Sequence, residues 1–86
     1  MKATEKRQAK LPLVEVEWVD ACSKAGWRPR KEYIEQAIDP CRTAGYLVAS
    51  NRKQVVVVQS LSDTSGHVTD GIVIPRVSVK KIRRLT

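Results

Sequence analysis

A run of basic side chains closes the sequence and is its clearest chemical feature. Residues 76–86 contain no Asp or Glu and five cations: Arg76, Lys80, Lys81, Arg83 and Arg84. Apolar residues interleave with them, so the apolar side chains can anchor the segment while the cations face solvent. Because clustered cations attract phosphate groups, we expect these five residues to bind a phosphate-bearing anionic ligand. Arg52 and Lys53 are expected to assist, and the ligand would be a nucleic acid or a nucleotide.

An edge strand of a sheet is the alternative interpretation, since charged side chains keep such a strand from pairing with another chain. The sequence has 16 Lys and Arg against 9 Asp and Glu, a formal net charge of +7. Residues 11–75 hold seven basic and eight acidic residues, so the excess lies at the two ends. That distribution is compatible with both interpretations.

Residue types that support catalysis or metal binding are sparse. The single histidine, His67, lies in a segment rich in Ser, Asp and Gly, and nearness in sequence to serines does not define a catalytic triad. Cys22 and Cys41 are 19 positions apart, whereas zinc ligands come in closely spaced pairs. We therefore expect no enzymatic activity, no metal and no cofactor.

The cellular compartment is inferred from the sequence features that would direct the chain to a membrane or to export. No apolar run approaches the length of a membrane span, which is about 18 residues or more. The basic N-terminus has no apolar core behind it, unlike a secretory signal. Without export, cysteines remain reduced thiols. We expect a cytoplasmic protein without a membrane partner.

Alternating apolar residues predict five short strands. In residues 11–20, Val14, Val16 and Trp18 share one face, which should point into the core. Further strands are expected within residues 43–50, 55–60, 72–74 and, after a turn at Pro75, 77–85. Gly45 is expected to let the second strand bend, with close approach of a backbone or a ligand as the alternative.

One short helix is predicted over residues 28–38. Pro29 suits a first helical turn, and Tyr33, Ile34, Ala37 and Ile38 form one apolar stripe. Trp27 precedes this helix and is compatible with either a core or a stacking role. Closely spaced strands with polar turns favour a small five-stranded β-barrel, because closure removes exposed edges. We expect a basic N-terminal arm at residues 1–10 and one domain at residues 11–86.

A protein–protein module is the second functional hypothesis. Val55, Val56, Val57 and Val58 offer apolar side chains to both faces of a sheet, which is typical of a covered strand or an interface. Together with Tyr33 and Ile34 they form the candidate interface. A chain of 86 residues gains stability by association, so we expect a homo-oligomer, with a dimer favoured over a ring.

Several segments resemble a set of small proteins encoded by bacteriophages and prophages. The resemblance spans residues 14–85 and is carried by residues 14–20, 26–27, 43–48, 74–77 and 82–85 (VEVEWVD, GW, TAGYLV, IPRV and IRRL). It implies a small phage-type accessory protein; under the protein–protein hypothesis, its partner would be a host protein or a virion component. The strand order is similar to that of Sm-like and SH3-like barrels, which commonly form rings or bind nucleic acid. Sm proteins, however, place their helix before the first strand.

Overall fold

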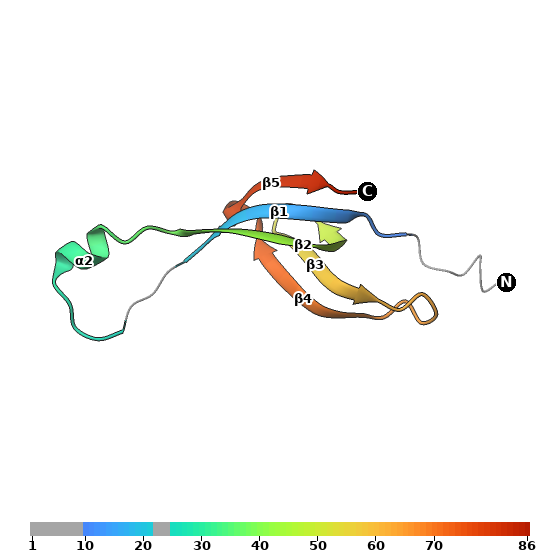
Figure 1. Cartoon of the computed structure of the whole chain (residues 1–86), viewed down its shortest axis with the longest axis horizontal. Coiled ribbons are helices and arrows are strands. Elements are labelled where there is room, and N and C mark those ends of the chain that lie inside the picture. Colours follow the sequence, from blue (N-terminus) through green and yellow to red (C-terminus); the bar gives the residue numbers. More distant parts are fainter. Residues whose placement is uncertain (1–9, 22–24) are drawn as a thin grey trace.

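The computed structural model of the chain describes residues 10–21 and 25–86. The described elements follow the order β1 (Leu13–Asp20), α2 (Arg30–Ile34), β2 (Asp39–Ser50), β3 (Gln54–Leu61), β4 (Val68–Pro75), the 3-10 turn η1 (Arg76–Ser78) and β5 (Val79–Arg84). The strands form one antiparallel sheet with the order β4-β3-β2-β1-β5 (Figure 1). The prediction of a mainly β protein with five strands and one short helix is confirmed. The N-terminal arm predicted at residues 1–10 lies outside the described residues, except for Lys10.

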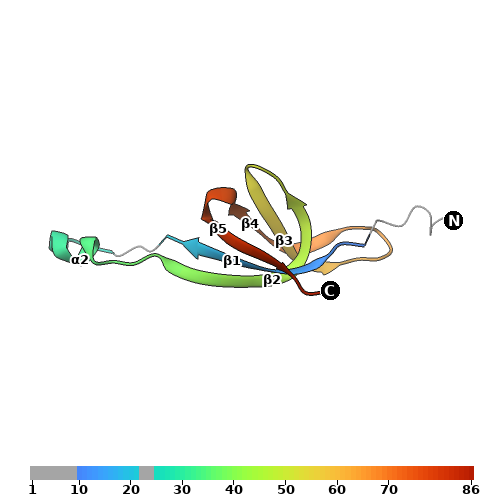
Figure 2. The ribbon, with the colours of Figure 1, turned by 90° about the horizontal axis from the view of Figure 1, so that it is seen from above.

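A sharp bend in β2 shapes the sheet. The first part of β2 pairs with β1 as far as Tyr46, and the part from Tyr46 onward pairs with β3. The β2–β3 register shifts between Leu47 and Ala49, which is the signature of a β-bulge. As a result, β3 and β4 run obliquely to β1 rather than beside it (Figures 1 and 2).

Gly45 permits this bend because it has no side chain. A Cβ atom at Gly45 would lie only 2.6 Å from Cγ1 of Val57 and 2.6 Å from the carbonyl oxygen of Val58. The backbones of β2 and β3 therefore approach each other more closely than any other residue at position 45 would allow. This contact is the close approach of a backbone, which was the alternative interpretation of Gly45.

The core lies on the inner face of the bent sheet. Its buried members are small branched residues, namely Val14, Val16, Val55, Val57 and Ile74. Val58 is also buried, with 4% of its surface exposed. Three of the four valines that were expected to form an interface, Val55, Val57 and Val58, are therefore buried and not exposed to a partner. The physical reason is that Val55 and Val57 belong to the core of the bent sheet, where they pack with Val14, Val16 and Ile74.

Two strands are longer than the sequence pattern predicted. β4 begins at Val68 rather than at residue 72, and β2 begins at Asp39 rather than at residue 43. Asp39 pairs with Asp20 and Pro40 with Val19, so the Asp-Pro pair opens a strand instead of ending a helix. Proline is tolerated there because the pairing of β2 with β3 begins only at Tyr46, which leaves Pro40 on an open edge.

The helix is much shorter than predicted, five residues instead of eleven. Isolated helices of this length have little stability of their own and depend on burying an apolar face. α2 lies beyond the end of the sheet and contains no buried residue (Figure 1). The apolar stripe that predicted a longer, packed helix is therefore exposed.

Trp18 packs against the core and is hydrogen-bonded to the neighbouring strand β2. It is half-buried against the core cluster, and its indole Nε1 donates a hydrogen bond to Oγ1 of Thr43 at 3.0 Å. Because the ring is packed against the core but not fully buried, we expect Trp18→Ala to lower the free energy of unfolding by about 2–3 kcal/mol. Trp18→Phe should cost about 1 kcal/mol, mainly the hydrogen bond. Urea denaturation measures both, and equal midpoints for the parent and Trp18→Ala would disprove this packing.

Candidate functional surfaces

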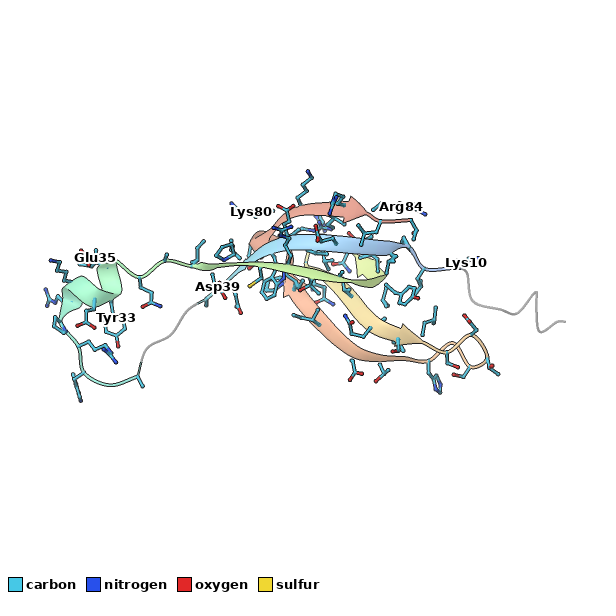
Figure 3. All side chains as sticks on the ribbon, in the orientation of Figure 1. Lys10, Tyr33, Glu35, Asp39, Lys80 and Arg84 are labelled. Atoms are coloured by element: carbon cyan, nitrogen blue, oxygen red, sulfur yellow. The ribbon has the colours of Figure 1, made fainter. Side chains whose placement is uncertain are left out.

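Residues 25–38 link β1 to β2 and form what we call the hairpin tip. Figure 3 shows the tip, with Tyr33 and Glu35 labelled, standing away from the sheet. The exposed fraction is 104% for Trp27, 79% for Ile34 and 60% for Ile38. Large apolar side chains are thus gathered in solvent at one end of the molecule.

Short-range contacts hold the hairpin tip in shape. The guanidinium of Arg28 donates to Oε1 of Glu32 at 3.1 Å and to the carbonyl oxygen of Ala25 at 3.1 Å. The hydroxyl of Tyr33 donates to the carbonyl oxygen of Gly26 at 3.2 Å. Gly26 has a φ of 87°, a conformation that glycine adopts without strain. These contacts fold the segment around Trp27 back onto α2, so the tip presents a preformed surface.

The basic residues of β5 have acidic neighbours on β1. Arg83 donates a hydrogen bond to Oε1 of Glu15 at 2.9 Å, and Lys81 lies directly opposite Glu17 in the β1–β5 register. Nε of Arg84 donates to the carbonyl oxygen of Thr86 at 2.9 Å. β5 is also an edge of the sheet, as the alternative interpretation of the basic run requires.

Arg76 ties two separate segments together. Its Nε donates to the carbonyl oxygen of Asn51 at 2.9 Å, its Nη2 donates to Oγ of Ser50 at 2.6 Å, and its backbone amide donates to the carbonyl oxygen of Lys53 at 2.9 Å. η1 is thereby fixed against the β2–β3 turn. The structure thus brings Arg52 and Lys53 next to Arg76, as a common site would require.

The seven predicted cations do not form one cluster. Figure 3 labels Lys80 and Arg84 near opposite ends of β5. Lys80 follows η1 closely in the chain, whereas Arg83 and Arg84 lie near the start of β1, where Val14 pairs with Arg84. The structure therefore divides the predicted anionic site into two groups of different surroundings.

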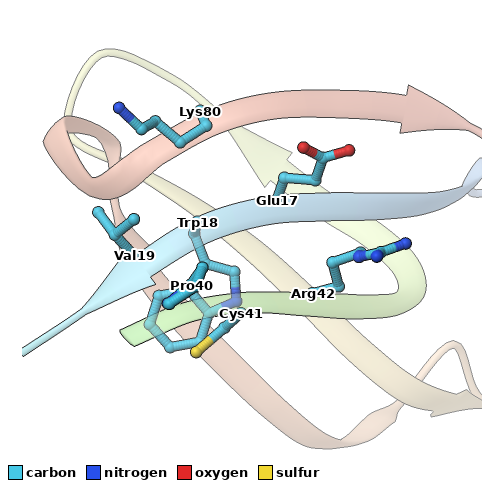
Figure 4. Close-up of a pocket in the computed structure, with 7 residues that line it drawn as sticks. All are labelled: Glu17, Trp18, Val19, Pro40, Cys41, Arg42 and Lys80. Atoms are coloured by element: carbon cyan, nitrogen blue, oxygen red, sulfur yellow. The ribbon is translucent and has the colours of Figure 1, made fainter. Parts of the chain in front are cut away.

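An open hollow of about 450 Å³ lies where the hairpin leaves the sheet. It is lined by Glu17, Trp18, Val19, Pro40, Cys41, Arg42 and Lys80 (Figure 4). The thiol of Cys41 donates to the carbonyl oxygen of Asp39 at 3.4 Å. Cys22 lies outside the described residues. No group of three or more His, Cys, Asp or Glu side chains suited to a metal ion occurs within residues 10–21 and 25–86.

The segment around His67 is a turn between β3 and β4. The hydroxyl of Ser62 accepts the backbone N–H of Ser65 at 3.2 Å, and the hydroxyl of Ser65 accepts the backbone N–H of His67 at 3.1 Å. Both serines thus stabilise the turn through their hydroxyl groups, as Ser commonly does in turns. His67 itself is exposed to solvent.

Sequence reasoning missed the hairpin tip as a unit. It singled out Tyr33 and Ile34 as candidate interface residues on a predicted helix, and it left Trp27 undecided. The feature that locates the tip is the pairing of Asp20 with Asp39, which places residues 25–38 outside the sheet. That pairing is a long-range property of the fold.

Comparisons with family models, with curated proteins and with solved structures find no match to this chain. The resemblance to phage-encoded proteins therefore stays a prediction. In the part of the chain that the structure describes, no helix has the length and apolar character needed to cross a membrane.

Proposed function

We propose that this protein is a non-catalytic protein-interaction module whose binding element is the hairpin tip. The observation that carries the proposal is the joint exposure of Trp27, Ile34 and Ile38 on a projecting segment held by its own hydrogen bonds. Trp, Tyr and Arg dominate the energetic centres of protein interfaces, and the tip supplies all three types. Because the tip is preformed, little ordering entropy opposes binding.

The charges of the tip favour a protein over a lipid surface as its partner. Residues 25–38 contain three cations (Arg28, Arg30 and Lys31) and two acids (Glu32 and Glu35), which gives a net charge of 3 − 2 = +1. Anionic membranes select strongly basic segments. A mixed-charge rim around an apolar centre is instead the composition of protein interfaces.

The proposed biological setting follows the sequence resemblance. The chain would act as a phage accessory protein in the host cytoplasm, with a host protein or a virion component as its partner.

We also propose that the bent sheet is an open small barrel of the Sm-like or SH3-like kind, which is supported by β5 lying next to β1 and by the bend at Gly45. The burial of Val55, Val57 and Val58 removes the valine strand from the arguments for a homo-oligomer, which leaves only the small size of the chain.

Substitution at the centre of the tip tests the proposal. We expect Trp27→Ser to abolish photo-crosslinking of the protein to its partner in a lysate of the source organism, with an affinity loss of about 30-fold or more. Val77 is the matched control, because it is 95% exposed but lies in η1, away from the tip. Val77→Ser should crosslink like the parent.

The same experiment can also contradict the proposal that the tip is the binding element. If both variants crosslink equally well, the tip is not the binding element. If the crosslinked species is a second copy of this chain, sedimentation of the parent and of Trp27→Ser will show it as a dimer that the substitution dissociates.

A further inference from the structure

We propose that the junction of the β2–β3 turn with η1 binds the phosphate groups of a nucleic-acid backbone. This site, the turn patch, consists of Arg52, Lys53, Arg76 and Lys80. It is separate from the hairpin tip and does not depend on the protein-binding function proposed above. It also differs from the site expected from the sequence, because Arg83 and Arg84 are not part of it.

Arg76 is the fixed point of the turn patch. It is half-buried, and the hydrogen bonds to Asn51 and Ser50 use two of the five N–H donors of its guanidinium. The backbone bond from Arg76 to Lys53 holds the β2–β3 turn against η1. Two segments that are more than 20 residues apart in sequence thus present their cations at one place.

Lys80 is directed toward the same end of β5 by a bulge. In the β1–β5 register, Glu17 is opposite Lys81 and Trp18 is opposite Val79, so Lys80 is the extra residue. Bulges commonly re-aim a side chain in this way. Figure 4 shows the side chain of Lys80 reaching toward the end of β5 that adjoins η1, away from the carboxylate of Glu17.

The turn patch retains its positive charge because no acid compensates it. Neither residues 50–54 nor residues 75–84 contain Asp or Glu. By contrast, Arg83 is bonded to Glu15 and Lys81 faces Glu17. Within the described residues, the ion pairs involve neither Arg52, Lys53 nor Lys80, all of which are exposed. Among the described cations of the β2–β3 turn and of residues 76–84, those of the turn patch therefore keep an uncompensated positive charge.

The arrangement fits a polymer backbone better than a small nucleotide. Small ligands are held in concave sites that enclose most of their surface. The exposed cations of the turn patch, Arg52, Lys53 and Lys80, lie on a turn and on the strand that follows η1, which suits contacts to successive phosphates along a strand. Binding of this kind is independent of sequence, with a dissociation constant of about 1–100 µM at physiological salt.

Two double variants of equal charge change test the inference. Fluorescence anisotropy with labelled single-stranded and duplex DNA should show binding by the parent at 50 mM salt. We expect Arg52→Ser with Lys53→Ser to weaken binding at least tenfold and to lower the slope of log K against log salt by about two. Arg83→Ser with Arg84→Ser removes the same charge and should change the affinity by less than about threefold.

Each contrary outcome overturns the inference. Equal weakening by the two double variants would mean that binding follows net charge alone. No binding by the parent at 50 mM salt would mean that the cations serve solubility and edge protection. Displacement of DNA by ATP at an equal phosphate concentration would assign the site to a free nucleotide.

Both double variants are expected to fold, since none of the four substituted side chains is buried. Thermal unfolding followed by circular dichroism checks this. The outcome is independent of Trp27→Ser, so this proposal and the proposed function can fail separately.

Discussion

Gly45→Ala is expected to remove more than half of the free energy of unfolding of the protein. The added methyl group would meet Cγ1 of Val57 and the carbonyl oxygen of Val58, each at 2.6 Å. Val57 is fully buried, and the carbonyl group belongs to the backbone of β3, so neither can move without displacing that strand. Overpacking of this kind costs about 3 kcal/mol. A domain of this size has a total stability of about 5 kcal/mol, so the loss is severe.

Gly71→Ala is the matched control for this prediction. Its added methyl group would lie 3.0 Å from Cγ1 of Val58 and 3.5 Å from a backbone carbonyl. The closer atom belongs to a side chain that can shift slightly, so we expect a cost of about 1 kcal/mol. Urea denaturation of both variants measures the difference. Equal unfolding midpoints would show that the close crossing at Gly45 does not constrain the fold.

The strands of the body could be predicted because each carries a local signal. Val14 and Val16 alternate with Glu15 and Glu17, and the structure buries the two valines while the glutamates face the β5 cations. The turn after Pro75 and the strand that follows it were also visible locally. Period-two alternation is determined by neighbouring residues alone, which is why these elements are readable from one sequence.

The hairpin tip could not be predicted because its apolar residues resemble core residues. Tyr33, Ile34 and Ile38 have helical spacing, and such a stripe indicates burial only when something packs against it. Whether a covering surface exists depends on the pairing of β1 with β2 up to Asp20 and Asp39. That pairing moves residues 25–38 beyond the sheet, so their periodicity does not lead to burial.

The surroundings of the predicted anionic residues could not be read from the sequence for a similar reason. The sequence shows that Arg83 lies in an acid-free run, but its ionic partner Glu15 is 68 positions away. In the same way, Arg76 contacts Ser50 and Asn51 from across the chain. Charge runs identify cations, whereas only the strand register shows which of them are neutralised by their neighbours.

The buried core and the proposed binding element lie in different parts of the structure. All described members of the buried core lie in β1, β3 and β4, and none lies at residue 21 or within residues 25–38. We therefore expect a shortened chain, in which Asn-Gly replaces residues 21–38, to fold. An Asn-Gly pair forms the two-residue turn that joins antiparallel strands without disturbing their register. Its melting temperature should lie within about 5 °C of that of the parent, which corresponds to about 1 kcal/mol.

The shortened chain should lose the partner completely while keeping the turn patch. Removing Trp27, Ile34 and Ile38 together eliminates the apolar centre of the tip, so the affinity for the crosslinked partner should fall at least about 100-fold, or about 3 kcal/mol. DNA binding should stay as in the parent, because Arg52 and Lys53 lie in the body. Crosslinking reports the first property and anisotropy the second. A shortened chain that still captures the same partner would place the binding element on the sheet, and one that fails to fold would show that the tip is needed for folding of the domain.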